Sequence, residues 1–108
     1  MKKPIECKTM RELFRTPKRW TKFVEYRTAD GLMCSDESAT SCCLVGGLSI
    51  IYGAEYNEKA FDLMEAIKKY SKRHKKLAKI RVKSIPQWND HKRVEFKDVQ
   101  EVVKLAHL

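Results

Sequence analysis

The sequence predicts a small single domain of the α+β class, in which a central apolar helix packs with two to three further helices and a small antiparallel β-hairpin or sheet. Its 108 residues fall within the usual size of one domain, so we assign residues 1–108 to a single domain. Apolar residues make up 43% of the chain, which is enough for one core although 34% of the residues are charged. Helical and alternating apolar patterns both occur, and together they indicate a mixed class.

The N-terminal third predicts short helical turns followed by a hairpin. Residues 9–12 fit a capping box, which favours a short helix that starts at Met10. A proline suits the first position of a new turn, so residues 17–20 are expected to form one turn that ends in a core tryptophan. The β-forming run 22–27 leads to Asp30-Gly31 and then to apolar residues 32–34, which is a hairpin signal.

The middle of the chain predicts the central helix. Residues 38–52 are apolar on nearly every side of a helix, a pattern typical of a helix at the centre of a soluble protein. Gly46 and Gly47 each cost about 1 kcal/mol relative to Ala within a helix, so we expect another backbone to approach closely there. Gly53 ends the helix in the position favoured for a left-handed cap.

The C-terminal half predicts two more helices. Asn57 is a candidate cap for a helix that runs to about Lys76 with one apolar face. Residues 79–83 alternate between apolar and basic side chains, so they are a candidate third strand of the sheet, and Pro86 stops it. A last helix is expected at about residues 95–107.

The net charge of +9 is unevenly distributed along the chain. Residues 1–27 carry nine bases and three acids, residues 28–67 one base and seven acids, and residues 68–108 thirteen bases and four acids. These segments therefore sum to +6, −6 and +9. A chain with two basic ends favours an anionic partner.

The strongest functional signal is a basic segment between residues 68 and 83. It holds nine bases in sixteen residues, and no acid lies between Glu65 and Asp90. Such a stripe can neutralise several phosphates, and it can equally attract an acidic protein surface. Tyr70 and His74 lie within it as candidate stacking groups, although a solvated helix face is the simpler alternative. The nine bases are Lys68, Lys69, Lys72, Arg73, Lys75, Lys76, Lys79, Arg81 and Lys83.

A second candidate site is the Trp88-Asn89-Asp90 element together with Arg93. We favour a structural interpretation, in which Asn89 or Asp90 bonds backbone groups in a turn, Trp88 packs on the core and Arg93 pairs with Asp90. In the alternative interpretation, Asp90 and Arg93 shape a small polar pocket.

The four cysteines lack the paired spacing of zinc or thiol redox sites, so we expect reduced thiols, no metal and no cofactor. A mixed metal site of cysteines and histidines is a less favoured alternative. Cys42 and Cys43 fall in the first turns of the predicted central helix, where the helix dipole lowers a thiol pKa, and His91 is a candidate base. A helix that is apolar on all sides would instead bury both thiols and raise their pKa.

Four short motifs carry a family resemblance. Residues 17–21 read P-K-R-W-T, D-G follows at residues 30–31, residues 43–48 read C-L-V-G-G-L, and W-N-D-H-K-R spans residues 88–93. Together they resemble a family of short bacterial and phage proteins of unknown function. This chain departs from the family pattern at Gly47, Val94 and Val99. The resemblance leaves residues 68–83 outside it, and it implies the fold and a bacterial or phage origin but no reaction.

We therefore predict a non-enzymatic basic binding protein of bacterial or phage origin that engages nucleic acid or an acidic host protein, in host takeover or inhibition of a defence system if a phage encodes it. The alternative is a small thiol hydrolase centred on Cys42 or Cys43 with His91. No secretory signal follows Met1, and the longest apolar stretch is about half the roughly 20 residues that a membrane-spanning helix needs, so we expect a cytoplasmic protein without a membrane partner.

Overall fold

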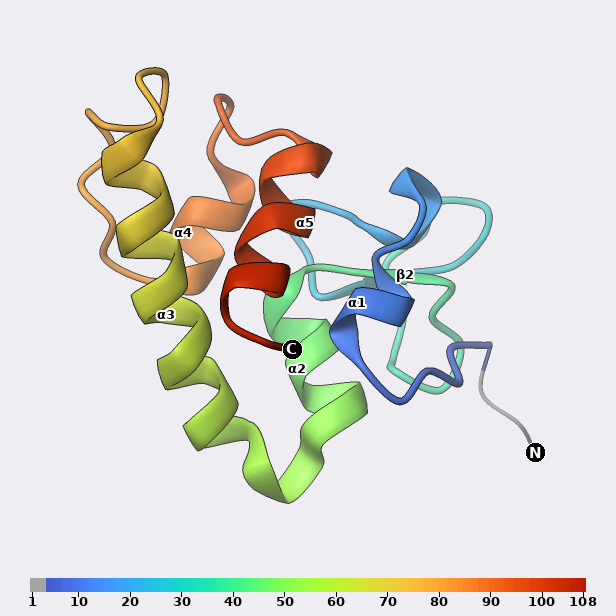
Figure 1. Ribbon diagram of the computed structural model, residues 1–108. Helices are drawn as coiled ribbons and strands as arrows, with labels where there is room; N and C mark the ends of the chain where they lie inside the picture. The colour runs from blue at the N-terminus through green and yellow to red at the C-terminus, as the bar shows by residue number, and fades with distance from the viewer. Residues whose placement is uncertain (1–3) are drawn as a thin grey trace.

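The computed structural model describes residues 4–108, which combine five α-helices with a two-stranded antiparallel sheet and so confirm the α+β prediction (Figure 1). The helix α3 runs along one side of the molecule, and the N-terminal turns and the two strands lie on the other side. The elements are α1 (Met10–Leu13), η1 (Pro17–Arg19), β1 (Tyr26–Arg27), β2 (Ser41–Cys42), α2 (Leu44–Tyr52), η2 (Gly53–Glu55), α3 (Tyr56–Arg73), α4 (Ile85–Asp90) and α5 (Phe96–Leu105).

The helix α2 is central, as predicted, because it packs against α1, α3 and α4. Its fully buried Leu44 and Leu48 join the core that α3 and α5 complete. A Cβ added at Gly46 would lie 2.7 Å from the carbonyl oxygen of Glu25, which confirms the close backbone approach predicted from the glycine pair. Gly53 ends the helix with a φ of 45°.

The start of α2 corrects the predicted range 38–52, because α2 begins at Leu44. The preceding Ser41 and Cys42 form β2 and pair with Arg27 and Tyr26 of β1. Both β2 residues are buried, so pairing satisfies backbone groups that would otherwise lack partners away from water. An apolar run of this kind fits a helix and a buried strand equally well.

The hairpin prediction is right about the turn and wrong about the main partner strand. Gly31 adopts a φ of 84°, and the amide of Thr28 donates to the carbonyl of Leu32 at 2.8 Å. Past this turn the returning chain makes one isolated bridge, Arg27 to Met33. Met33 is 74% exposed, so extending this pairing would bury little apolar surface, and β2 serves as the partner strand.

The segment 79–83 forms no strand, which corrects the third-strand prediction. Its alternation still holds, since Ile80 and Val82 are half-buried and Arg81 and Lys83 are exposed. The helix before it, α3, ends at Arg73 instead of about residue 76, and it follows η2 directly with no side-chain cap from Asn57.

The helix α4 was not predicted, although it carries a recognisable start signal. Ser84 caps it by accepting a hydrogen bond from the amide of Gln87 at 3.2 Å, and Pro86 lies in its first turn. Its Trp88 is fully buried, whereas Trp20, expected as the core tryptophan, is half-buried at the edge of the core.

Candidate functional site

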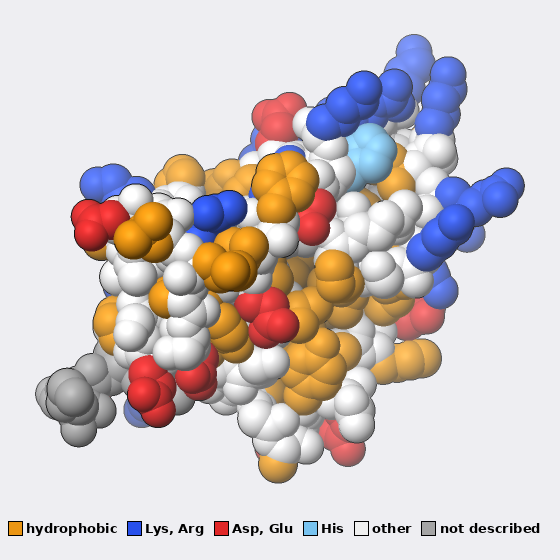
Figure 2. Space-filling view, turned by 180° about the vertical axis from the view of Figure 1, so that it is seen from behind, with side chains coloured by type: hydrophobic (Ala, Val, Ile, Leu, Met, Phe, Trp, Pro, Cys, Tyr) orange, Lys and Arg blue, Asp and Glu red, His pale blue; other side chains and the backbone are white. Residues whose placement is uncertain are grey.

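The last two turns of α3 present a basic outer face. Lys68 and Lys72 are four residues apart, as are Lys69 and Arg73, so the four side chains form two stacked pairs on the exposed side of the helix. The opposite side buries Ala66, Ile67, Tyr70 and Ser71 against the core. Figure 2 shows Lys and Arg side chains (blue) that project from the molecule at the upper right of the view.

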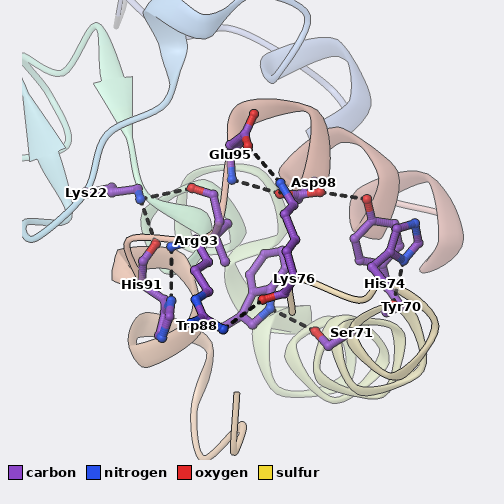
Figure 3. A network of polar contacts seen from close by, with 11 residues as sticks. Lys22, Tyr70, Ser71, His74, Lys76, Trp88, His91, Arg93, Glu95 and Asp98 are labelled. Atoms are coloured by element: carbon purple, nitrogen blue, oxygen red, sulfur yellow. Dashed lines mark hydrogen bonds and ion pairs between the residues drawn. The ribbon is translucent and has the colours of Figure 1, made fainter. Parts of the chain in front are cut away.

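The chain after α3 continues this face and is pinned to the core at its start. Leu77 is fully buried, and its amide donates to the carbonyl of His74 at 2.9 Å. The neighbouring Lys76 forms ion pairs with Glu95 and with Asp98, each at 2.9 Å (Figure 3). The charge of Lys76 is therefore compensated inside the molecule, and this residue does not belong to the free basic surface.

Asp98 is the fully buried centre of this network. Its carboxylate accepts hydrogen bonds from the hydroxyl of Tyr70 at 2.7 Å and from the amide of Glu95 at 2.8 Å, in addition to the ion pair with Lys76. Burial raises the pKa of Asp98, but the hydrogen bonds from Glu95, Lys76 and Tyr70 outweigh it and hold the pKa below its ordinary value. The network fixes the end of α3 to the start of α5.

Two candidate stacking groups belong to this network. The Tyr70 ring is 8% exposed, and the His74 ring stacks on it with a centroid distance of 3.7 Å. Burial and the bond to Asp98 raise the pKa of the Tyr70 hydroxyl. Tyr70 is thus packed inside the protein and not available to stack on a nucleic-acid base.

Gln87 holds the extended segment 80–83, and sequence reasoning missed it. Its side-chain nitrogen donates to the carbonyl of Arg81 at 2.9 Å, and its side-chain oxygen accepts from the amide of Lys83 at 2.7 Å. The Gln87 side chain thus makes two hydrogen bonds to the backbone of this segment, of the kind that a neighbouring strand would make. The start signal of α4 places Gln87 near the segment but does not reveal these two bonds.

We name the eight exposed bases of the segment 68–83 the basic surface. Among residues 4–108, none of the eight forms an ion pair with a carboxylate. The exposed Arg93 lies next to them, because its guanidinium donates to the carbonyl of Lys76 at 3.4 Å. The members of the basic surface are Lys68, Lys69, Lys72, Arg73, Lys75, Lys79, Arg81 and Lys83.

Asn89, from the second candidate site, is a fully buried hub that ties three segments together. Its side-chain oxygen accepts from the indole nitrogen of Trp20 at 2.8 Å and from the amide of Leu44, the first residue of α2, at 3.1 Å. Its side-chain nitrogen donates to the carbonyl of Thr21 and to the carboxylate of Asp90. Asn89 therefore uses its side-chain amide to hold these segments of the fold together.

The rest of that element also makes internal contacts. The indole nitrogen of the buried Trp88 donates to the hydroxyl of Ser71 at 2.9 Å. Asp90 accepts from the amide of Phe23 at 2.8 Å, and the guanidinium of Arg93 bonds the Lys76 carbonyl in place of the expected Asp90. A depression of about 200 Å³ beside Asp90 does not include Arg93 among its lining residues, so the structure does not bring these two residues together in one pocket.

The cysteines of the hydrolase alternative lie in an environment that opposes the thiolate. Cys42 is fully buried and Cys43 is 6% exposed, and burial raises the pKa of both thiols. Cys43 uses its sulfur to cap α2 by accepting from the amide of Gly46 at 3.4 Å. His91 accepts through Nδ1 from the amide of Arg93 at 3.1 Å. No group of three or more metal-ligating side chains occurs within residues 4–108.

The fold and this surface define a small α+β protein with a basic surface on the end of α3 and the chain that follows it. The chain belongs to a family of unknown function, DUF6197, whose model matches residues 7–107. The matched range includes residues 68–83, which corrects the expectation that the basic segment lies outside the family resemblance. Neither the comparison with curated proteins nor the comparison with solved structures finds a match. In residues 4–108, no helix has the length and apolarity to cross a membrane.

Proposed function

We propose that this protein is a non-enzymatic nucleic-acid-binding protein that uses the basic surface to contact phosphate groups. The main support for the proposal is a set of eight exposed bases within sixteen residues, none of which pairs with a carboxylate in residues 4–108. Each base that neutralises a phosphate releases a condensed counterion, which is the main source of sequence-independent affinity. Six of the eight are lysines, which favours contacts with the phosphate backbone over the bidentate base contacts made by arginine.

The lack of apolar anchors on this surface favours nucleic acid over an acidic protein partner. Protein interfaces depend on a few buried aromatic or apolar anchors that fill pockets on the partner. The large hydrophobic side chains that residues 4–108 expose all lie outside the segment 68–83; they are Phe23, Leu32, Met33, Phe61 and Leu105. A surface that offers charge alone suits a partner whose own charge is regular and dense.

The anchoring of the segment supports the same proposal. Lys76, Leu77 and Gln87 fix the chain between α3 and α4, so its exposed bases project from a backbone of defined shape. Less conformational freedom is then lost on binding than for a disordered basic tail. The place of action we propose is the cytoplasm of a bacterium or of a phage host, where nucleic acid and the free thiols found in residues 4–108 occur together.

Fluorescence anisotropy with mixed-sequence single-stranded and duplex oligonucleotides at low salt tests the proposal. Replacing Lys72, Lys75 and Lys79 with Glu lowers the net charge from +9 to +3 and should abolish binding. The matched control replaces the exposed Arg11, Lys97 and Lys104 with Glu and reaches the same net charge. Lys76 is left unchanged in both variants because its loss would leave the buried Asp98 without its cation.

Three results would overturn this function. The first is no binding by the unaltered protein at low salt. The second is an equal loss of affinity in the two triple variants, which would mean that net charge, and not the basic surface, governs binding. The third is displacement of the oligonucleotide by poly-glutamate at equal charge concentration, which would point to an acidic protein surface as the partner.

A further inference from the structure

A second positively charged region lies on the other side of the molecule from the end of α3, where η1 meets the two strands (Figure 1). It is a surface depression with a volume of about 720 Å³. Small-molecule sites typically have volumes of roughly 300–1,000 Å³. The depression is therefore large enough for a ligand the size of a nucleotide, and the function proposed above does not use it.

The small sheet explains why cations gather in this depression. In the register of β1 and β2, Arg27 lies opposite Ser41, so their side chains share one face of the sheet. Tyr26 lies opposite Cys42 on the other face, where the Tyr26 ring approaches Gly46 of α2. Because side chains alternate along β1, Tyr26 points toward the core and Arg27 points toward the depression. Arg27 and Ser41 both line the depression.

Two guanidinium groups of the lining are held in place by neutral partners. Arg27 donates to the hydroxyl of Thr21 at 2.7 Å, to the carbonyl of Gly31 at 2.8 Å and to the carbonyl of Lys22 at 3.3 Å. Arg27 has five N–H donors, so two stay open. Carbonyl and hydroxyl partners fix the position of a guanidinium but leave its positive charge uncompensated.

Arg19 is held in the same manner from the next turn of the chain. Its Nη1 donates to the carbonyl of Thr40 at 3.3 Å and to the carbonyl of Pro4 at 3.5 Å, which leaves three donors open. The neighbouring Lys18 lines the same depression and is exposed. Among residues 4–108, Arg19, Lys18 and Arg27 form no ion pair with a carboxylate.

The remaining polar side chains of the lining carry hydroxyl groups and add no negative charge. Thr21, Thr28, Thr40 and Ser41 all line the depression, and no Asp or Glu does so within residues 4–108. Three cations in a concave site raise the local concentration of anions, and the gain is greatest for a dianion. Open donors on two fixed guanidinium groups suit the oxygen geometry of phosphate.

We propose that this depression binds a small phosphate-bearing molecule through Lys18, Arg19 and Arg27. The site is separate from the basic surface, so the two bind independently. Phosphate oxygens accept from the open guanidinium donors and from the lysine ammonium, and the threonine and serine hydroxyls complete the polar lining.

The test is a titration followed by backbone amide NMR shifts in a phosphate-free buffer, with inorganic phosphate, AMP and adenosine as separate probes. Phosphate and AMP should produce saturable shifts at the amides of residues 18–21, 27–31 and 40–41. Adenosine, which lacks the phosphate, should bind there much more weakly than AMP. Arg19→Gln should weaken phosphate binding by about tenfold or more, the usual effect of losing a hydrogen bond to a charged group.

Two further variants keep the result interpretable. Lys18→Gln changes an exposed side chain without a hydrogen bond in residues 4–108, so it tests the site without disturbing the fold, and it should also weaken binding. Lys97→Gln is the matched control; it removes the same charge from α5 and should leave affinity unchanged.

Several outcomes would overturn the proposal. Phosphate shifts centred on residues 68–83 would assign phosphate binding to the basic surface and leave the depression without a ligand. Equal affinity in Lys18→Gln and the unaltered protein, or adenosine binding as tight as AMP binding, would remove the role of the cations. The absence of saturable shifts at millimolar phosphate and AMP would reject the site altogether.

Discussion

Asn89 links the N-terminal turn, the start of α2 and α4, so its removal tests how the fold is held together. Asn89→Ala leaves the buried amide of Leu44 and the partly buried indole nitrogen of Trp20 without their acceptor. A buried donor without a partner costs about 1–3 kcal/mol. With the cavity left by the side chain, we expect a loss of about 3–5 kcal/mol in the free energy of unfolding, which is a large part of the stability of a typical small domain.

Urea denaturation followed by circular dichroism measures this loss. The matched control is Asn57→Ala, because Asn57 is exposed on α3, and a surface substitution there should change stability by no more than about 0.5 kcal/mol. If Asn89→Ala lowered the free energy of unfolding by less than about 1 kcal/mol, Asn89 would not hold these segments together and this reasoning would be refuted.

Three further predictions concern the core, the buried carboxylate and the thiols. In thermal denaturation, Gly46→Ala should lower the melting temperature more than Gly47→Ala does. The new Cβ at residue 46 would lie 2.7 Å from a backbone oxygen, whereas the Cβ at residue 47 would meet the ends of side chains at 3.2 Å. Equal melting temperatures of the two variants would contradict the prediction. The folded pKa of Asp98 lies below the ordinary 3.8, so its stabilising effect is complete above that value and is lost as the pH falls through the folded pKa; Asp98→Asn should remove this part of the acid sensitivity, and an unchanged pH profile would count against it. Cys43 should react slowly with a thiol reagent at neutral pH, because burial raises the pKa of its thiol. A reaction rate equal to that of an exposed model thiol would instead favour the hydrolase alternative.

Local patterns were sufficient for the parts of the fold that depend on neighbouring residues. The periodic apolar face predicted α3 and α5, and the glycine pair predicted the close contact between α2 and another backbone. The strand β2 was missed because its partner lies about fifteen residues earlier in the chain, and pairing at that separation leaves no local signal. In the range 38–52, the buried pairing of Ser41 and Cys42 displaced the first turns of the expected helix.

In the candidate site as well, the sequence predicts local features but not contacts between distant residues. The density of bases between residues 68 and 83 is visible in the sequence, and so is their alternation with Ile80 and Val82. The role of Lys76 is not visible, because its carboxylate partners lie at the start of α5 and are brought near by the packing of α5 on α3. The sequence does not indicate that Arg27 and Arg19 lie together, since their common depression depends on the register of the small sheet.

The salt dependence of oligonucleotide binding tests the central claim most directly. For duplex DNA, each neutralised phosphate contributes about 0.9 to the slope of log affinity against log salt, so the eight bases of the basic surface set an upper limit of about 7 for its steepness. Replacing Lys72, Lys75 and Lys79 with Gln should lower the steepness by about 3, while the same Gln replacements at Arg11, Lys97 and Lys104 should leave the steepness unchanged. An affinity that does not change with salt, or a slope that falls equally in both variants, would contradict nucleic-acid binding by this surface.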